Sequence, residues 1–126
     1  MFLGRVTNWT SVVGQNIPFI TIKNSNNKIA NNSGAIQLLR KGWWDLDASL
    51  VLTGVADDVI VSVYADNAED GTYAEASVTA AGFTTVSLTD AIHTVLSRYP
   101  DVATVSVRVD TAGVDVSGQI RIEYVS

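Results

Sequence analysis

The sequence predicts an all-β protein, an antiparallel β-sandwich, from three observations. Apolar and polar side chains alternate along several segments, as they do on strands with one buried face. Turn-forming Gly, Asn and Asp residues separate these segments. Only one segment has the spacing of an amphipathic helix. Many short strands divided by turns are typical of a sandwich.

The composition indicates one domain that covers residues 1–126. A chain of 126 residues that is 47% apolar can bury a core without disulfides or metals. Only 17% of the residues are charged, and the mean hydropathy is +0.21. So few charges favour a partner subunit that covers part of the apolar surface.

Several classes of function are excluded or disfavoured. The net charge is −5, so the chain lacks the basic surface expected for nucleic acid or an anionic membrane. No Cys is present, which excludes disulfides, thiolate catalysis and zinc–thiolate sites. No apolar run is long enough for a membrane span, and residues 1–5 lack a signal-peptide pattern. We therefore expect synthesis in a cytoplasm, with no nucleic-acid partner and no membrane insertion.

Residues 42–53 give the longest strand pattern. Its even-numbered positions from Trp44 to Leu52 are apolar and share one face, which we expect to pack on the core. The opposite face is mixed and carries Trp43, Asp45 and Asp47. This predicts a long strand with one buried face.

Further strands are expected on both sides of this segment. Before it they cover residues 5–13, 17–23, 28–30 and 35–40, with hairpin tips in the Asn-rich stretches 24–27 and 31–34. Residues 1–13 are read as a first strand or an anchor segment. After it we expect strands at 59–65, 72–80, 83–88, 102–110 and 116–125.

One short helix is expected near residues 90–98. Ile92, Val95 and Leu96 have i, i+3, i+4 spacing, and Thr89 or Asp90 can cap the start. Pro100 would end the helix.

At this point the order of the segments resembles the C1q/TNF-like trimeric jelly roll. An apolar strand, an Asn/Gly turn, a short strand and a Gly-x-aromatic start to a long strand occur in that order, with Trp44 as the aromatic. Two later strands look like the family's closing strands, although Pro100 replaces a Gly and the expected helix is not a family feature. The matching stretches are 17–19, 31–36, 41–44, 101–105 and 117–122.

The resemblance implies a homotrimer. In the family's trimer, the outer faces of three strands turn toward the threefold axis, and here these faces would bring acids, arginines and one tryptophan together. Acids and arginines at such an interface can pair across subunits. An ordinary solvated sheet face is the alternative. The expected trimer interface comprises Trp43, Asp45, Asp47, Arg108, Arg121 and Glu123.

Short, Cys-free versions of this domain look most like those in phage structural proteins, such as head fibres, decoration proteins and fibre tips. This likeness implies a non-enzymatic structural module on the surface of a virion, made in the host cytoplasm. Its partners would be copies of itself and other virion proteins. The alternative is an adhesive tip that binds a carbohydrate or receptor, such as a host surface glycan.

Catalytic and metal sites have little support in the sequence. His93 is the only histidine and lacks a recognisable nucleophile or second ligand, so a structural place on the expected helix is favoured. Residues 66–71 are acidic but lack EF-hand spacing, which leaves a weak cation site as the alternative to a solvated turn. Asp45 and Asp47 lack a third catalytic group. We expect no enzyme activity, no metal and no cofactor.

Overall fold

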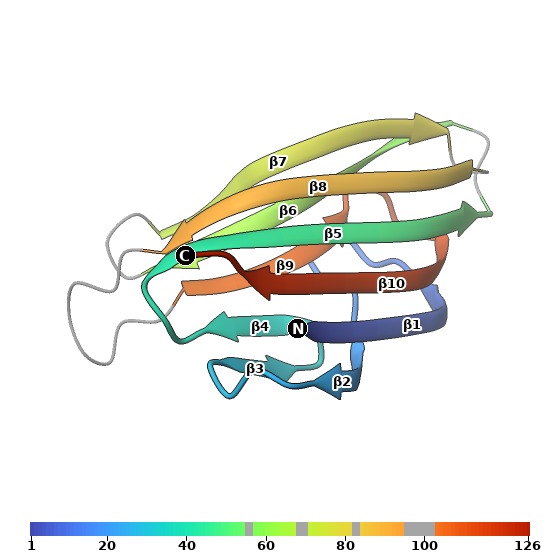
Figure 1. Cartoon of the computed structure of the whole chain (residues 1–126). Helices are drawn as coiled ribbons and strands as arrows, with labels where there is room; N and C mark the ends of the chain where they lie inside the picture. Colours follow the sequence, from blue (N-terminus) through green and yellow to red (C-terminus); the bar gives the residue numbers. More distant parts are fainter. Residues whose placement is uncertain (55–56, 68–70, 82–83, 95–102) are drawn as a thin grey trace.

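The computed structural model describes residues 1–54, 57–67, 71–81, 84–94 and 103–126. In this part of the chain, ten strands form two antiparallel sheets packed face to face (Figure 1). The front sheet has the order β2-β1-β10-β5-β8, and the back sheet has the order β3-β4-β9-β6-β7. The strands are β1 (Phe2–Thr10), β2 (Ile20–Asn24), β3 (Ile29–Asn32), β4 (Ala35–Leu38), β5 (Gly42–Thr53), β6 (Asp58–Asn67), β7 (Gly71–Ala81), β8 (Thr84–Thr94), β9 (Ala103–Val109) and β10 (Asp115–Tyr124).

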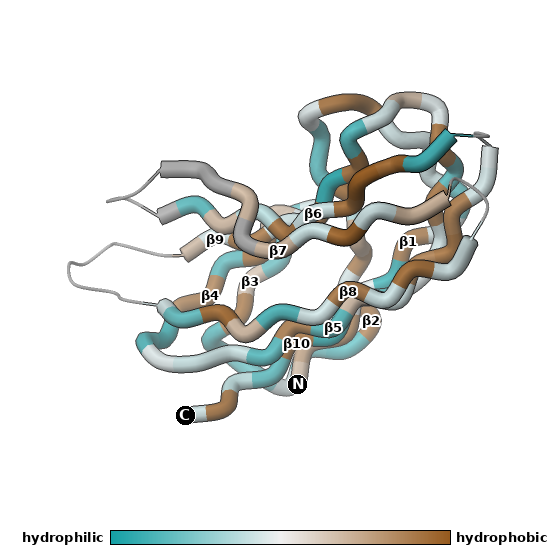
Figure 2. The backbone as a smooth tube through the Cα atoms, turned by 90° about the horizontal axis from the view of Figure 1, so that it is seen from above, coloured by the Kyte–Doolittle hydropathy of each residue, from teal (hydrophilic) through white to brown (hydrophobic). Residues whose placement is uncertain are grey.

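The core lies between the two sheets, as the alternation of side chains predicts. Along β5 every second residue from Trp44 to Leu52 is buried, and the residues between them are exposed. The same alternation continues on β10 and β8, and Figure 2 shows it as changing colour along these strands. From the back sheet, β9 contributes Val105 and Val107, both fully buried. The all-β prediction is confirmed.

Trp44 is the largest fully buried side chain. Its indole Nε1 donates to the carbonyl oxygen of Arg40 at 3.1 Å and to Thr94 Oγ1 at 3.3 Å. Its ring packs edge-on against Tyr124, with 4.9 Å between the ring centroids. Because the polar edge of the indole finds acceptors, the ring can be buried without an unsatisfied donor.

The helix expected near residues 90–98 is wrong for the residues that can be seen. Residues 90–94 belong to β8, which pairs with β5 along its whole length, with Trp44 opposite Ile92. Val86, Leu88 and Ile92 are buried with the two-residue period of a strand. Pairing with the long β5 strand therefore outweighs a local helical spacing that rested on three side chains. Residues 95–98 lie outside the described part.

The start of the second strand also differs from the prediction. Residues 17–19 are irregular, and β2 begins only at Ile20. Pro18 has no N–H for a sheet, but Ile17 and Phe19 are buried. The Ile17 N–H donates to the Val107 carbonyl oxygen at 2.8 Å, so this segment lies along β9 before the chain enters the front sheet.

Of the two hairpin tips expected in the Asn-rich stretches, the one at 31–34 forms between β3 and β4. The stretch 24–27 is not a hairpin tip, because it joins β2 of the front sheet to β3 of the back sheet. Asn31 Oδ1 accepts the Gly34 N–H at 3.0 Å, and Asn31 Nδ2 donates to the Phe19 carbonyl oxygen at 2.9 Å. Ser33 and Gly34 have positive φ angles of 48° and 91°. A Cβ on Gly34 would lie 1.9 Å from the Ile17 carbonyl oxygen, so only glycine fits.

The strand order places the first part of the chain along one side of the sandwich. β2 and β3 are edge strands on this side, and β8 and β7 are edge strands on the other (Figure 1). No helix in the described part is long and apolar enough to cross a membrane.

Candidate functional site

The outer side of the front sheet, called here the front face, carries most of the residues predicted to act together. On β5 the outward side chains include Trp43, Asp45 and Asp47. β10 lies beside β5, with Glu123 opposite Asp45 and Arg121 opposite Asp47. These five side chains come together because residues paired across an antiparallel sheet share one face.

Four of these five residues line a groove of about 500 Å³ between β10, β5 and β8. Two small side chains of β8 leave it open, since Thr89 lies opposite Asp47 and Ala91 opposite Asp45. The groove is thus acidic at its centre and has small side chains on its β8 side. The lining residues are Asp45, Leu46, Asp47, Thr89, Asp90, Ala91, Arg121 and Glu123.

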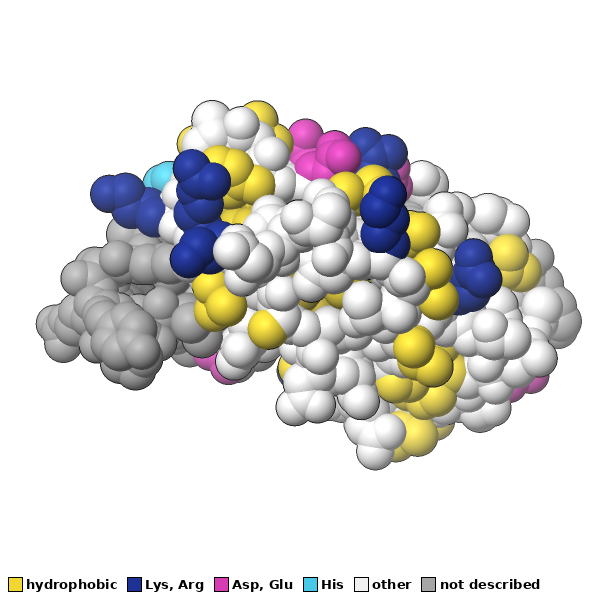
Figure 3. All heavy atoms as spheres, turned by 60° about the horizontal axis from the view of Figure 1, so that its bottom comes forward, with side chains coloured by type: hydrophobic (Ala, Val, Ile, Leu, Met, Phe, Trp, Pro, Cys, Tyr) yellow, Lys and Arg dark blue, Asp and Glu magenta, His cyan; other side chains and the backbone are white. Residues whose placement is uncertain are grey.

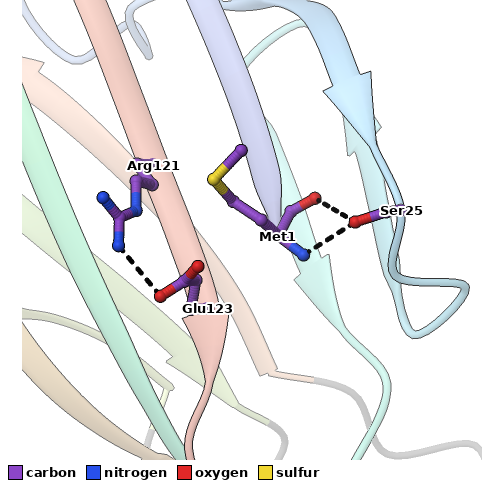
Figure 4. Close-up of polar contacts among 4 residues, drawn as sticks. All are labelled: Met1, Ser25, Arg121 and Glu123. Atoms are coloured by element: carbon purple, nitrogen blue, oxygen red, sulfur yellow. Dashed lines mark hydrogen bonds and ion pairs between the residues drawn. The ribbon is translucent and has the colours of Figure 1, made fainter.

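The charges of the groove are only partly matched within the chain. Arg121 Nη2 lies 3.0 Å from Glu123 Oε2, and the two side chains are 54% and 43% exposed (Figure 4). Such an exposed pair contributes little stability. Among the described residues, the carboxylates of Asp45 and Asp47 have no hydrogen-bond or ion-pair partner. Asp45 also lies opposite the like charge of Glu123, which is unfavourable unless a cation comes near.

An aromatic pair lies at one end of the groove. The Trp43 and His93 rings stack, with 4.5 Å between centroids and 23° between planes. Trp43 is 47% exposed, although it lies on the same strand as the fully buried Trp44. His93 therefore lies on strand β8 beside Trp43, and its expected place on a helix is wrong.

The structure separates Arg108 from the other predicted interface residues. Arg108 lies on β9 in the back sheet, not beside β5 and β10. Its guanidinium Nε donates to Asn16 Oδ1 at 2.9 Å and its Cζ lies 4.5 Å from the Tyr64 ring centroid. Within one protomer, β9 pairs with β4 and β6 in the back sheet. The expectation that the outer side of β9 joins the front face is therefore wrong within one protomer. Whether the six residues meet a partner subunit stays a prediction.

The opposite side of the front face carries a second groove that sequence reasoning missed. It has a volume of about 400 Å³, and its mostly apolar wall includes Trp9, Pro18, Ile20 and Ile22, with Arg5 beside them. Ile20 is 70% exposed and Ile22 is 49% exposed. One signal in the sequence points to this surface, since residues 1–44 contain no Asp or Glu.

The chain start closes this side of the sheet. The Met1 amino group donates to Ser25 Oγ at 2.9 Å, and Ser25 Oγ donates to the Met1 carbonyl oxygen at 3.2 Å (Figure 4). The Ser25 N–H also donates to the Met1 carbonyl oxygen at 3.0 Å. These contacts hold the start of β1 against the end of β2, so β1 and β2 present one continuous outer surface.

The weak cation site considered for residues 66–71 includes residues 68–70, which lie outside the described part. Among the residues that are described, no group of three or more His, Cys, Asp or Glu side chains is placed to hold a metal ion.

Comparisons with known proteins identify the fold. No protein-family model matches the sequence, and no curated protein matches it. Among solved structures, Eiger TNF from S. frugiperda superposes with a TM-score of 0.70 at 12% identity, covering 99% of this chain and 93% of that one. The globular domain of zebrafish complement 1qA gives 0.68 at 9%, covering 99% and 96%. Murine APRIL gives 0.64 at 8%, covering 95% and 98%.

The chain therefore has a C1q/TNF-like jelly-roll fold. At these identities the likeness establishes the fold alone.

Proposed function

We propose that this chain is a non-enzymatic structural module that assembles into a homotrimer through its front face. The observation that carries the proposal is the location of exposed apolar side chains. In the described part of the chain, four of the eight exposed large apolar residues lie in front-sheet strands, and only one lies in a back-sheet strand. The four are Ile20, Ile22, Trp43 and Val51; Ile60 lies on β6, and Val12, Val13 and Val125 lie in the segments that follow β1 and β10.

Exposed apolar side chains cost little when scattered, but their concentration on one sheet marks an interaction surface. Burying that surface against other copies would remove it from water at about 25 cal/mol per Å². A closed ring of copies is favoured over an open-ended row of copies, because a ring leaves no front face uncovered.

The mass of the protein in solution tests this proposal. Light scattering on a sizing column should give three times the 13.5 kDa of one chain. A monomer at micromolar concentration would contradict it. Trp43→Ala should weaken the trimer, and Ile60→Ala on the back sheet is the matched control that should leave it unchanged.

We place the trimer on a bacteriophage particle, as a head-fibre or decoration protein made in the host cytoplasm and exposed on the virion. Its support is the likeness of short, Cys-free domains of this kind to phage structural modules. A chain without Cys needs no oxidising compartment to fold, which suits assembly inside a cell. Particles purified from cells that encode the chain should contain its peptides by mass spectrometry. Their absence from such particles would contradict this location.

A carbohydrate- or receptor-binding tip is the second candidate. The Trp43–His93 stack favours it, because an exposed aromatic ring offers a flat apolar surface with a polar edge. A glycan array tests this function directly. Binding that is lost in Trp43→Ala while the trimer persists would favour the adhesive role over a purely structural one.

A further inference from the structure

The charges of this chain are separated along its sequence. Residues 1–44 contain five Lys or Arg residues and no acid, whereas residues 45–126 contain all 13 acids and only three Arg residues. The net charges of the two parts are therefore +5 and −10, which together give the −5 of the whole chain.

Part of this separation appears on one surface, where two of the five basic residues and two of the 13 acids lie on opposite sides of the front face. β1 and β2 form one side of the front face, with Arg5 opposite Ile20 and Lys23 opposite Leu3. Figure 3 brings this side forward and shows Lys and Arg side chains among apolar ones, with acidic side chains beside a basic one at the upper rim. We name Arg5, Ile20, Ile22 and Lys23 the basic side.

β5 and β8 form the other side of the same face. Asp45 and Asp47 lie there over the groove, next to the small side chains of Thr89 and Ala91. We name these four residues the acidic side. Between the two sides lies β10, whose Arg121 and Glu123 pair with each other.

The charges of both sides lack partners within the chain. Among the described residues, the side chains of Arg5, Lys23, Asp45 and Asp47 make no hydrogen bond or ion pair. The basic side also carries exposed apolar surface that a second copy can cover, since Ile20 is 70% and Ile22 49% exposed.

We propose that the basic side of one copy docks on the acidic side of the next, which fixes the order and rotation of subunits in the ring. This rests on the proposed homotrimer. In a homotrimer whose front faces turn toward a threefold axis parallel to the strands, each copy is rotated by a third of a turn relative to the next copy. One side of the face then meets the opposite side of its neighbour, which is a heterologous, ring-closing contact. Meeting of like sides would place uncompensated charges together.

Charge reversal tests this contact. One variant carries Arg5→Glu and Lys23→Glu, a second carries Asp45→Lys and Asp47→Lys, and a third carries all four substitutions. Each pair alone should raise the dissociation constant of the trimer by about 100-fold or more, because like charges then face each other. The variant with all four substitutions restores opposite charges at every contact. Its dissociation constant should therefore return to within about tenfold of that of the unchanged protein.

Analytical ultracentrifugation over a concentration series measures these constants, and circular dichroism checks that each variant is folded. Asp57→Lys with Asp58→Lys is the matched control for the acidic pair, because it makes the same charge change at the exposed start of the back-sheet strand β6. This control should leave the trimer unchanged.

The outcomes separate the two proposals. A trimer that persists in both reversed pairs overturns the charge-matched contact and leaves the homotrimer standing. If the variant with all four substitutions stays dissociated, the proposed contact is overturned as well, because the basic and acidic sides then do not face each other. An original chain that is monomeric at every concentration overturns both proposals.

Discussion

Trp43 and Trp44 are neighbours in the sequence, yet they lie in opposite environments because successive side chains of a strand point to opposite faces. Trp44→Ala should destabilise the fold by roughly 3–5 kcal/mol, since it leaves a large cavity in the core. Trp43→Ala should change the stability of the monomer by about 0.5 kcal/mol or less, because its ring is half exposed. Urea unfolding at a low protein concentration measures both values. Equal losses would contradict the assigned faces.

Gly118 is fixed by the close approach of two strands. Its φ is +146°, and a Cβ would lie 2.1 Å from the Ser49 carbonyl oxygen on β5. Gly118→Ala should therefore cost roughly 3 kcal/mol or more, because the β10–β5 pairing must shift.

Gly113 provides the control for this substitution. It also has a positive φ of +83°, but a Cβ there would have no atom within 4 Å. Gly113→Ala should cost only about 1 kcal/mol from backbone strain. Chemical denaturation of both variants checks the difference, and a smaller loss for Gly118→Ala would contradict the steric explanation.

At the scale of elements, Ser11 joins the end of β1 to the turn between β9 and β10. Its hydroxyl donates to the Thr111 carbonyl oxygen and accepts the buried Val114 N–H at 2.9 Å. Ser11→Ala would leave that N–H without its partner, so we expect a loss of roughly 1–3 kcal/mol. Thermal unfolding measures it, with Ser87→Ala on the exposed side of β8 as a control that should change little. Faster amide exchange at Val114 should accompany the loss.

The elements also show where a local pattern misleads. Leu88 and Ile92 fit both a helix and a strand, because positions four apart share a face in each. The choice is made by β5, which offers a complete row of partners to residues 84–94. Such long-range pairing is absent from a short window of sequence, so the spacing of Ile92, Val95 and Leu96 suggested a helix.

At the scale of the whole molecule, assembly and folding should be coupled. If the front face is buried in a trimer, the unfolding temperature should rise by several degrees when the protein concentration rises about 100-fold. Raising the salt from about 0.05 M to about 0.5 M should weaken the trimer, since charges across partly exposed contacts are screened. Differential scanning calorimetry measures the first effect and ultracentrifugation the second. An unfolding temperature independent of concentration would contradict the coupling.

Alternation and turn residues along the sequence predict the fold class, the long β5 strand and the two faces of that strand. The cause is local, because a two-residue alternation and Asn- or Gly-rich turns act within a few neighbouring residues. The alternation assigns Trp44 to the core and Asp45 and Asp47 to the outer side.

Which strands share a sheet follows from the three-dimensional fold and not from the pattern of any one strand. Arg108 alternates as cleanly as Arg121, but β9 pairs in the back sheet and β10 in the front sheet, so one arginine leaves the expected surface and the other stays. Arg5 and Lys23 join that surface for the same reason, through the pairing of β1 with β10 and β2. Strand order depends on contacts between residues far apart in the chain, and alternation along one strand carries no information about its neighbour.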